Sequence, residues 1–329
     1  MRLDRLDNLP PRLLDIDVRE ISRIFPTPTL ISLAGIRSDP LFLSVLLHGN
    51  ETTSFRVLRE LANRYQHRRL PRSLLIFVGN VRAAAAGVRF LADQPDFNRI
   101  WRGGDDDYAD LARAVLSTAR GVNVFASIDI HNNTGANPHY ACVASLRPAD
   151  LQLAAMFATI GVFYHNPSTT QSIAFSTFCP ALTIECGRND DCTGTARAVQ
   201  LVEDVMRLDR FLSHPPSVDA LRLYETVGRV VIDPAMSFGE TEADLMLRSD
   251  LESVNFKETP AGLEWAKVRR GARTVRVLNE HGDDLTGEFF VYAGDALVMK
   301  RTVTPSMITL NRTAIRQDCL CYLMTPCQC

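Results

Sequence analysis

The chain has 329 residues, of which 46% are hydrophobic and 22% charged, and its formal net charge is -2. This composition is ordinary for a globular protein, and the length favours two domains. The near-neutral charge gives no general attraction for nucleic acid or anionic membranes, so no nucleic-acid partner is expected. Any binding of anions must depend on locally placed arginines.

The N-terminal stretch MRLDRLDNLPPRLLDID alternates charge with leucine and lacks the apolar core of a secretory signal. The longest apolar runs are LFLSVLL (41–47) and SLLIFV (73–78). Both have the length of strands and fall far short of the ~20 residues of a membrane span. A cytoplasmic location without membrane association is therefore expected.

Strand-like and helix-like stretches alternate through the first two thirds of the chain. Apolar runs predict buried strands at 41–47, 73–80, 124–130 and 181–186. Apolar residues at helical spacing predict helices at 53–65, 108–120, 148–160 and 196–212. This alternation predicts an α/β fold with a central, largely parallel or mixed sheet flanked by helices.

Two prolines in HPPS (214–217) follow the last of these helices and indicate a domain boundary. Beyond them, short β-branched runs bounded by glycine or proline predict a smaller β-rich domain. We therefore expect an α/β domain at 1–213 and a β-rich C-terminal domain at 214–329.

The β-rich domain ends in a cysteine-rich segment, CLCYLMTPCQC (319–329). Its two C-x-C pairs, Cys319/Cys321 and Cys327/Cys329, are able to bind a soft metal or form a cross-link. Their spacing differs from the C-x-x-C knuckle of structural zinc sites, so a structural or incidental role is favoured. The four other cysteines are scattered and are interpreted as small buried hydrophobes.

His48 and Glu51 form an H-x-x-E motif between the predicted strand at 41–47 and the predicted helix at 53–65. At such a turn an imidazole and a carboxylate can converge on one point. Catalytic zinc needs three nitrogen, oxygen or sulfur ligands from the protein and one open position. His131, at the end of the predicted strand 124–130, supplies the third ligand.

Glu185 closes the apolar run ALTI and marks a third strand end. Ligands of open α/β sheets bind at the carboxyl ends of strands, so the three strand ends can share one crevice. Bound zinc lowers the pKa of water to about 7, and Glu185 would act as the general base. Asp129, two residues before His131, is a candidate partner that orients an imidazole.

Several polar residues are candidates for contacts with substrate. Arg82, in GNVRAA after the strand at 73–80, would stabilise the oxyanion. Arg99, with Asn98 in PDFNRIW, would bind an acidic end of the substrate, because guanidinium groups hold carboxylates bidentately. From the residues alone, both arginines could equally lie on the surface. Asn132 is a weaker candidate, since local turn chemistry explains it almost as well.

Taken together, HGNE, NVRA, DFNR, DIHN and the E-x-G of ECG resemble, in this order, motifs of the aspartoacylase and succinylglutamate desuccinylase family. This family is a branch of the zinc carboxypeptidase superfamily. The resemblance covers roughly residues 40–190 and extends to a β-rich second domain. It implies zinc ligands at His48, Glu51 and His131, a base at Glu185, a carbonyl-polarising group at Arg82, and substrate carboxylate binding by Asn98 and Arg99.

One departure from the family concerns the substrate. Aspartoacylases carry an arginine in a T-T-R-S-I-A-like stretch, where it binds the side-chain carboxylate of aspartate. Here the stretch at 169–174 reads TTQSIA, and Gln171 has no charge to offer. The family's tyrosine just before this stretch is absent here, and Pro167 stands near its place. With Gln171 as a substrate-binding residue, a neutral, aromatic or otherwise modified acyl-amino acid is expected rather than acetyl-aspartate.

The predicted function is that of a zinc-dependent amidohydrolase, or deacylase, with one Zn2+ per chain and a small N-acyl amino acid as substrate. Two alternatives stay open. One is a zinc carboxypeptidase that acts on a peptide C-terminus, and the other is a non-catalytic relative that binds a small molecule. The sequence is compatible with a homo-oligomer.

Overall fold

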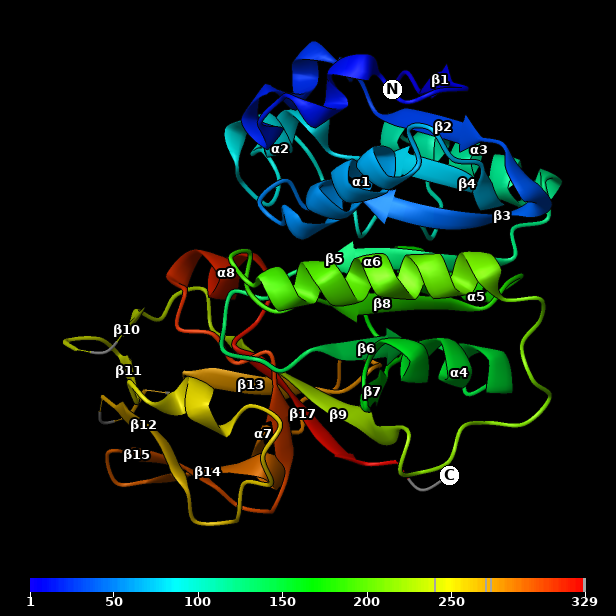
Figure 1. Cartoon of the computed structure of the whole chain (residues 1–329). Helices are drawn as coiled ribbons and strands as arrows, with labels where there is room; N and C mark the ends of the chain where they lie inside the picture. Colours follow the sequence, from blue (N-terminus) through cyan, green and yellow to red (C-terminus); the bar gives the residue numbers. More distant parts are fainter. Residues whose placement is uncertain (240, 270, 273, 328–329) are drawn as a thin grey trace. The chain divides into compact units, whose positions relative to one another are not determined.

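The computed structural model describes residues 1–239, 241–269, 271–272 and 274–327 (Figure 1). It divides into two compact units. The first consists of Met1–Asn132 and His139–Arg222, and the second of Asn133–Pro138 and Leu223–Cys329. The division into an α/β domain at 1–213 and a β-rich domain at 214–329 stays a prediction, because compact units need not be domains that fold independently.

The first unit is built on a sheet with the strand order β1-β2-β4-β3-β5-β8-β6-β7. Its strands are β1 (Asp4–Leu6), β2 (Thr29–Leu33), β3 (Gly35–Val45), β4 (Leu70–Val78), β5 (Ala126–His131), β6 (Tyr140–Val143), β7 (Ile160–Phe163) and β8 (Ala181–Glu185). The four central strands β4, β3, β5 and β8 are parallel, whereas β2 and β6 run antiparallel to their neighbours β4 and β8. The carboxyl ends of the central strands therefore meet at one edge, and the predicted mixed α/β sheet is confirmed.

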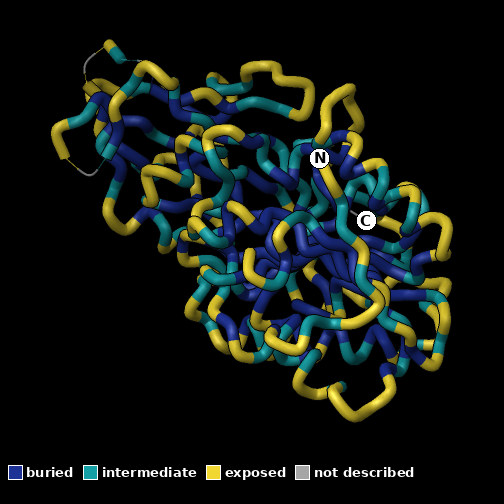
Figure 2. The backbone as a smooth tube through the Cα atoms, turned by 90° about the horizontal axis from the view of Figure 1, so that it is seen from above, coloured by how far each residue is buried: buried dark blue, intermediate teal, exposed yellow. Residues whose placement is uncertain are grey.

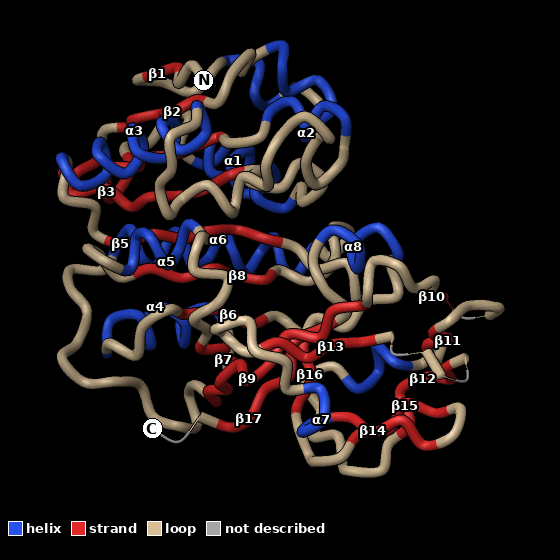
Figure 3. The backbone as a smooth tube through the Cα atoms, turned by 180° about the vertical axis from the view of Figure 1, so that it is seen from behind, coloured by secondary structure: helices blue, strands red, loops and turns tan. Residues whose placement is uncertain are grey.

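Helices cover both faces of this sheet (Figures 1 and 3). They are α1 (Thr53–Arg64), α2 (Val81–Ala86), α3 (Asp107–Gly121), α4 (Pro148–Phe157), α5 (Gln171–Ser176) and α6 (Cys192–Arg207), together with the short 3-10 helices η1 (Pro11–Leu14) and η2 (Val18–Arg23). Helices α1, α4 and α6 contact one another on one face, and α3 and α5 lie on the other. Because both faces are covered, the central strands are apolar without alternation.

Aromatic side chains fill the space between the sheet and the helices α3 and α5. Phe42 of β3 stacks on Phe175 of α5 with 4.2 Å between ring centroids, and Phe77 of β4 meets Trp101 at 5.8 Å. All four side chains are at most 3% exposed. Burial of each contributes roughly 2 kcal/mol or more to folding. Figure 2 shows the buried segments of the chain enclosed by exposed loops.

The second unit contains two sets of strands. Strand β9 (Arg222–Ile232) pairs antiparallel with β13 (Val275–Leu278) and with β17 (Cys321–Pro326), which pairs with β16 (Thr304–Ser306). A five-stranded sheet follows the order β10 (Phe238–Gly239), β11 (Leu245–Leu247), β12 (Glu264–Val268), β15 (Ala296–Met299) and β14 (Phe290–Ala293). The 3-10 helix η3 (Leu251–Val254) and the helices α7 (Thr286–Phe289) and α8 (Arg312–Gln317) complete the unit. The predicted β-rich C-terminal region is confirmed.

Two of the C-terminal cysteines, Cys319 and Cys321, are part of this unit's interior. Cys319 and Cys321 are 6% and 0% exposed, and burial raises the pKa of both thiols well above the usual range. Cys327 is half-buried, and Cys329 lies outside the described residues. Within the described part of the chain these cysteines form no group that could hold a metal. In the same part, no helix is both long enough and apolar enough to cross a membrane.

Candidate metal centre

The turn that carries His48 and Glu51 is fixed by its close approach to α2. A Cβ atom at Gly49 would lie 2.2 Å from the backbone carbon of Ala83, so only glycine fits here. The Gly49 N–H donates to the Arg89 carbonyl at 3.1 Å. Before the turn, Leu46 adopts a φ of 57°, and its N–H donates to Ser54 Oγ at 3.0 Å. This strained backbone turns His48 and Glu51 toward the strand edge.

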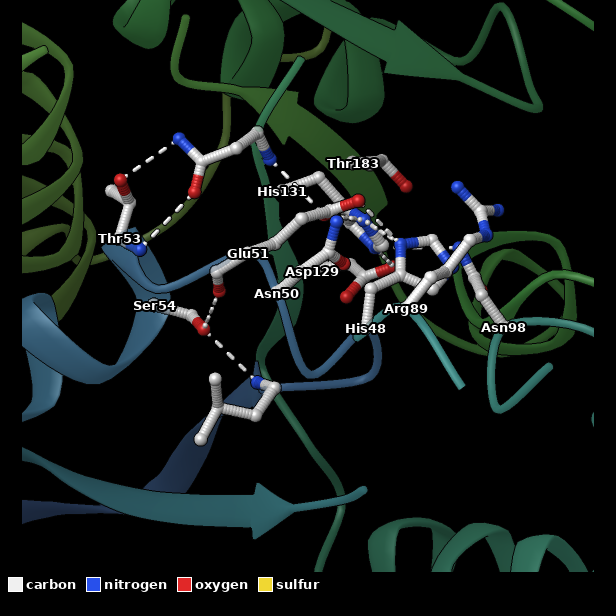
Figure 4. A network of polar contacts seen from close by, with 12 residues as sticks. His48, Asn50, Glu51, Thr53, Ser54, Arg89, Asn98, Asp129, His131 and Thr183 are labelled. Atoms are coloured by element: carbon white, nitrogen blue, oxygen red, sulfur yellow. Dashed lines mark hydrogen bonds and ion pairs between the residues drawn. The ribbon is translucent and has the colours of Figure 1, made fainter. Parts of the chain in front are cut away.

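His48, Glu51 and His131 converge at the carboxyl ends of β3 and β5 (Figure 4). Nδ1 of His48 lies 2.7 Å from Glu51 Oε1, and Nδ1 of His131 lies 2.7 Å from Glu51 Oε2. The two Nδ1 atoms are 3.1 Å apart. Among the described residues these three are the group that could hold a metal, with ligand atoms within 4.8 Å of one another. All three are at most 8% exposed.

Two carboxylates, the buried Asp129 and the half-buried Asp96, lie behind the imidazoles and can orient them. Nε2 of His48 lies 3.0 Å from Asp96 Oδ1, and Nε2 of His131 lies 2.8 Å from Asp129 Oδ2. In the tautomer in which each Nε2–H donates to its carboxylate, the two Nδ1 lone pairs would face the Glu51 oxygens. Such acceptor atoms repel one another unless a cation lies between them. Two histidines and one carboxylate, each histidine with a carboxylate behind it, form a donor set that fits zinc.

The pKa values of these residues show the same preference for positive charge. Burial alone would lower the pKa of His131, but Asp129 and Glu51 outweigh it and raise that pKa well above its ordinary value. Burial alone would raise the pKa of Glu51, but His48 and His131 outweigh it and hold that pKa well below the ordinary value. The carboxylates around His131 thus favour positive charge at this place.

Glu185 ends the strand next to the one that carries His131. The two residues are opposite each other in the β5–β8 register, and Glu185 is 6% exposed. Burial, reinforced by the charges of Glu51 and Asp129, raises the pKa of Glu185 to about 8, against the opposing effects of His131 and Arg89. A carboxyl group with this pKa exchanges protons near neutral pH.

The structure does not bring Arg82 to this centre. Its side chain is 56% exposed on α2 and pairs with Asp93 at 2.8 Å. This position corrects the expected placement of Arg82 beside the metal ligands. Instead, Arg89 is the cation near the centre, 15% exposed, with Nε and Nη2 within 3.0 Å of Asp96 Oδ2. Figure 4 shows Arg89 beside His48.

Asn98 and Arg99 follow Asp96 closely. Asn98 is 6% exposed, its Nδ2 lies 3.3 Å from His131 Nε2, and its Oδ1 accepts from the Gln171 N–H at 2.9 Å. Arg99 is half-buried, and its Nη1 donates to the Asn98 carbonyl at 3.0 Å. The structure therefore brings Asn98 to the centre, while substrate binding by either residue stays a prediction.

Asn132 and Gln171 both use their side chains inside the protein. Asn132 Oδ1 accepts from the Thr53 N–H at 3.1 Å, and Nδ2 donates to Thr53 Oγ1 at 2.8 Å and to the Gly187 carbonyl at 3.0 Å. Gln171 is fully buried, and its Nε2 donates to Ser127 Oγ of β5 at 2.7 Å. A contact of either side chain with substrate stays a prediction, and for Asn132 it would have to replace these bonds.

Asp96 and Arg89 were not among the site residues predicted from the sequence, although both lie beside His48. Asp96 stands inside the DFNR motif, two residues before Asn98, so the motif itself carried a signal for it. Arg89 had no comparable signal, because NVRAAAAGVRF offers two arginines seven positions apart. Helix α2 ends at Ala86, and Gly87 follows in the left-handed conformation. This helix end redirects the chain before Arg89, and it could not be predicted from the alanine run.

The model of the succinylglutamate desuccinylase/aspartoacylase catalytic domain matches residues 39–214, so the chain belongs to that family. Both family names describe enzymes that remove an acyl group. No curated protein has a sequence that matches this chain.

Solved structures share the fold at low sequence identity. Murine aminoacylase 3 is 15% identical, with a TM-score of 0.61 over 88% of this chain and 96% of the other. The succinylglutamate desuccinylase from Chromobacterium violaceum is 16% identical, with a TM-score of 0.58 over 89% and 86%. The succinylglutamate desuccinylase/aspartoacylase from Rhodobacter sphaeroides is 15% identical, with a TM-score of 0.56 over 90% and 88%.

Proposed function

We propose that this chain is a zinc-dependent amidohydrolase that removes the acyl group from a small N-acyl amino acid. The observation that carries the proposal is the convergence of the acceptor atoms of His48, Glu51 and His131 beside the buried Glu185. Family membership supports a deacylase in general. The zinc, the residue roles and the substrate are the finer parts of the proposal.

His48, Glu51 and His131 would hold the metal through two imidazole nitrogens and a carboxylate. When bound, zinc supplies Lewis acidity, which polarises a carbonyl oxygen and lowers the pKa of water. Asp96 and Asp129 keep both Nδ1 lone pairs aimed at the centre by accepting the Nε2 protons. This second layer also makes the imidazoles better ligands.

Glu185 would act as the general base. It takes a proton from the attacking water and passes it to the leaving nitrogen, so one residue serves both halves of the hydrolysis. Its raised pKa of about 8 suits this exchange near neutral pH. The buried position also keeps bulk water from competing for the proton, because Glu185 is only 6% exposed.

Arg89 would take the oxyanion-stabilising role that was expected of Arg82. It is half-buried, pairs with Asp96 and lies close enough to Glu185 to lower the pKa of that carboxyl. Negative charge that develops on the substrate carbonyl is stabilised most by a preorganised cation in a place poor in water. Asn98 would help to position the substrate, and Arg99 would bind its carboxylate.

We propose neutral or modified acyl-amino acids as substrates rather than acetyl-aspartate. The support is the uncharged Gln171, which cannot form an ionic clamp on a second carboxylate. The test is a panel of N-acyl amino acids with acidic, aromatic and aliphatic side chains, offered to the zinc-loaded, chelator-treated and zinc-restored protein. We expect hydrolysis that is lost with chelator, returns with zinc and favours neutral side chains. A zinc-loaded protein that cleaves no member of the panel would contradict the proposal.

A further inference from the structure

The loop after Glu185 is tied to the turn that carries Glu51 by one side chain, that of Asn189. Its Oδ1 accepts from the Thr52 N–H at 2.8 Å, and its Nδ2 donates to the Asn50 carbonyl. The carboxamide therefore holds the peptide groups on both sides of Glu51. This pattern is the one that a neighbouring strand would offer to a residue in a sheet.

The same loop has two further attachments to this region. The Asn189 carbonyl accepts from the guanidinium of Arg56 on α1. Two residues earlier, the Gly187 carbonyl accepts from Asn132 Nδ2 at 3.0 Å, and Asn132 also binds Thr53 at the start of α1. The loop is thus held at both Gly187 and Asn189.

These bonds replace the usual cap of α1. The side chain of the N-cap residue Thr52 makes no capping hydrogen bond. Unpaired N–H groups at a helix start need other acceptors, and here Asn189 serves Thr52 while Asn132 serves Thr53. The start of the helix that follows Glu51 is therefore fixed by the loop that follows Glu185, more than 130 residues away in the chain.

We propose that Asn189 is a positioning residue that sets the place of the Glu51 turn relative to Glu185. The inference rests on the proposed function, because this spacing matters only if both residues act on one substrate. A misplacement of about 1 Å between reacting groups can lower a rate by about a hundredfold. The side chain of Asn189 bonds to the backbone of Asn50 and Thr52 and not to the side chain of Glu51. It would therefore act on the centre only through this backbone.

Two substitutions separate positioning from simple loop stability. Asn189→Asp keeps an acceptor for the Thr52 N–H and adds a favourable negative charge at the start of α1. The aspartate loses the donor to the Asn50 carbonyl and places a carboxylate oxygen against that carbonyl oxygen, so that two acceptors face each other. Asn189→Ala loses both bonds. The matched control is Asp190→Ala, at the exposed neighbouring residue of the same loop.

The experiment measures kcat, KM and thermal midpoint for the zinc-loaded variants. For Asn189→Asp we expect a midpoint within about 3 °C of the control, a kcat at least about 10-fold lower and a KM changed by less than about 3-fold. Asn189→Ala should lower kcat by up to about 100-fold. A purely structural role predicts that kcat follows the midpoint. A stable Asn189→Asp protein with the control's kcat would overturn the proposal.

Hydrogen–deuterium exchange in the metal-free protein tests the clamp without zinc or substrate. Asn189→Ala should raise exchange at the Thr52 amide at least about 10-fold over the Asp190→Ala control, because that N–H loses its acceptor. Unchanged exchange would overturn the inference whatever the activity. Raised exchange in a protein that hydrolyses no acyl-amino acid would support the clamp and count against the proposed function alone.

Discussion

Two regions of this chain gather residue types that bind metals, and they differ in how those residues are arranged. At the carboxyl ends of β3 and β5, two histidines and a glutamate bring their acceptor atoms within 4.8 Å. At the end of the chain, Cys319 and Cys321 are equally buried, but their raised thiol pKa values keep them protonated. A thiol must lose its proton to bind a metal.

The partners behind the candidate ligands, and not only the number of such ligands, therefore distinguish the group that could hold a metal. Asp96 and Asp129 fix the tautomers of His48 and His131 and supply compensating charge. The cysteines pack as small hydrophobic residues in the core of the second unit, which includes Cys321.

Replacement of Glu185 by glutamine should have the largest effect. The amide cannot take a proton, so kcat should fall by about 10²–10⁴-fold while zinc content stays unchanged. Steady-state kinetics and mass spectrometry on the same preparation measure both quantities. A zinc-loaded E185Q protein within tenfold of wild-type kcat would remove Glu185 from the mechanism.

Replacement of Asp96 by asparagine should weaken the centre from its second layer. His48 loses a charged acceptor and Arg89 loses its ion-pair partner, so zinc affinity or kcat should fall by about 10–100-fold. Competition with a chromophoric chelator measures the affinity. The matched control is Asp93→Asn, which breaks the exposed pair with Arg82 and should change neither quantity. Equal effects of the two substitutions would contradict the role of Asp96 as the carboxylate that orients His48.

Replacement of Cys321 by serine should affect stability and leave the zinc content unchanged. A hydroxyl at this fully buried position without a ready partner costs about 1–3 kcal/mol of unfolding free energy. Urea unfolding measures this cost. The control Cys192→Ser, at an exposed position, should change the free energy of unfolding by less than about 0.5 kcal/mol. Loss of zinc from C321S alone would show that the cysteine segment does bind metal.

Asp191 gives the smallest predicted effect, and one that depends on pH. Partial burial would raise the pKa of this N-cap of α6, but hydrogen bonds from Thr193, His139 and Gly194 outweigh it and lower that pKa to about 2. The stabilisation is present above the unfolded pKa of about 3.9 and is lost as pH falls toward 2. Asp191→Ala should therefore cost about 1 kcal/mol at pH 7 and less at pH 3, measured by urea unfolding. An equal cost at pH 7 and pH 3 would contradict the role of the Asp191 carboxylate as a charged cap of α6.

The sequence was sufficient for the strands that carry the centre, because long buried runs such as 41–47 end directly at His48 and leave little choice of fold. It was insufficient for β6 and β7, which are only four residues each and lie beyond β8 in the sheet although they precede it in the chain. The exchange of Arg82 for Arg89 depended on where the short helix α2 ends. The Asn189 contact joins residues far apart in sequence and has no periodic signal at all.

Zinc content of the purified wild type and of His131→Ala decides whether this is a zinc site. We expect about one zinc per chain in the wild type and its loss in the variant, because two remaining ligands cannot hold a catalytic zinc. Inductively coupled plasma mass spectrometry on protein prepared without chelator and offered zinc gives the number. Wild-type protein without zinc under these conditions, or His131→Ala with an undiminished content, would contradict the account.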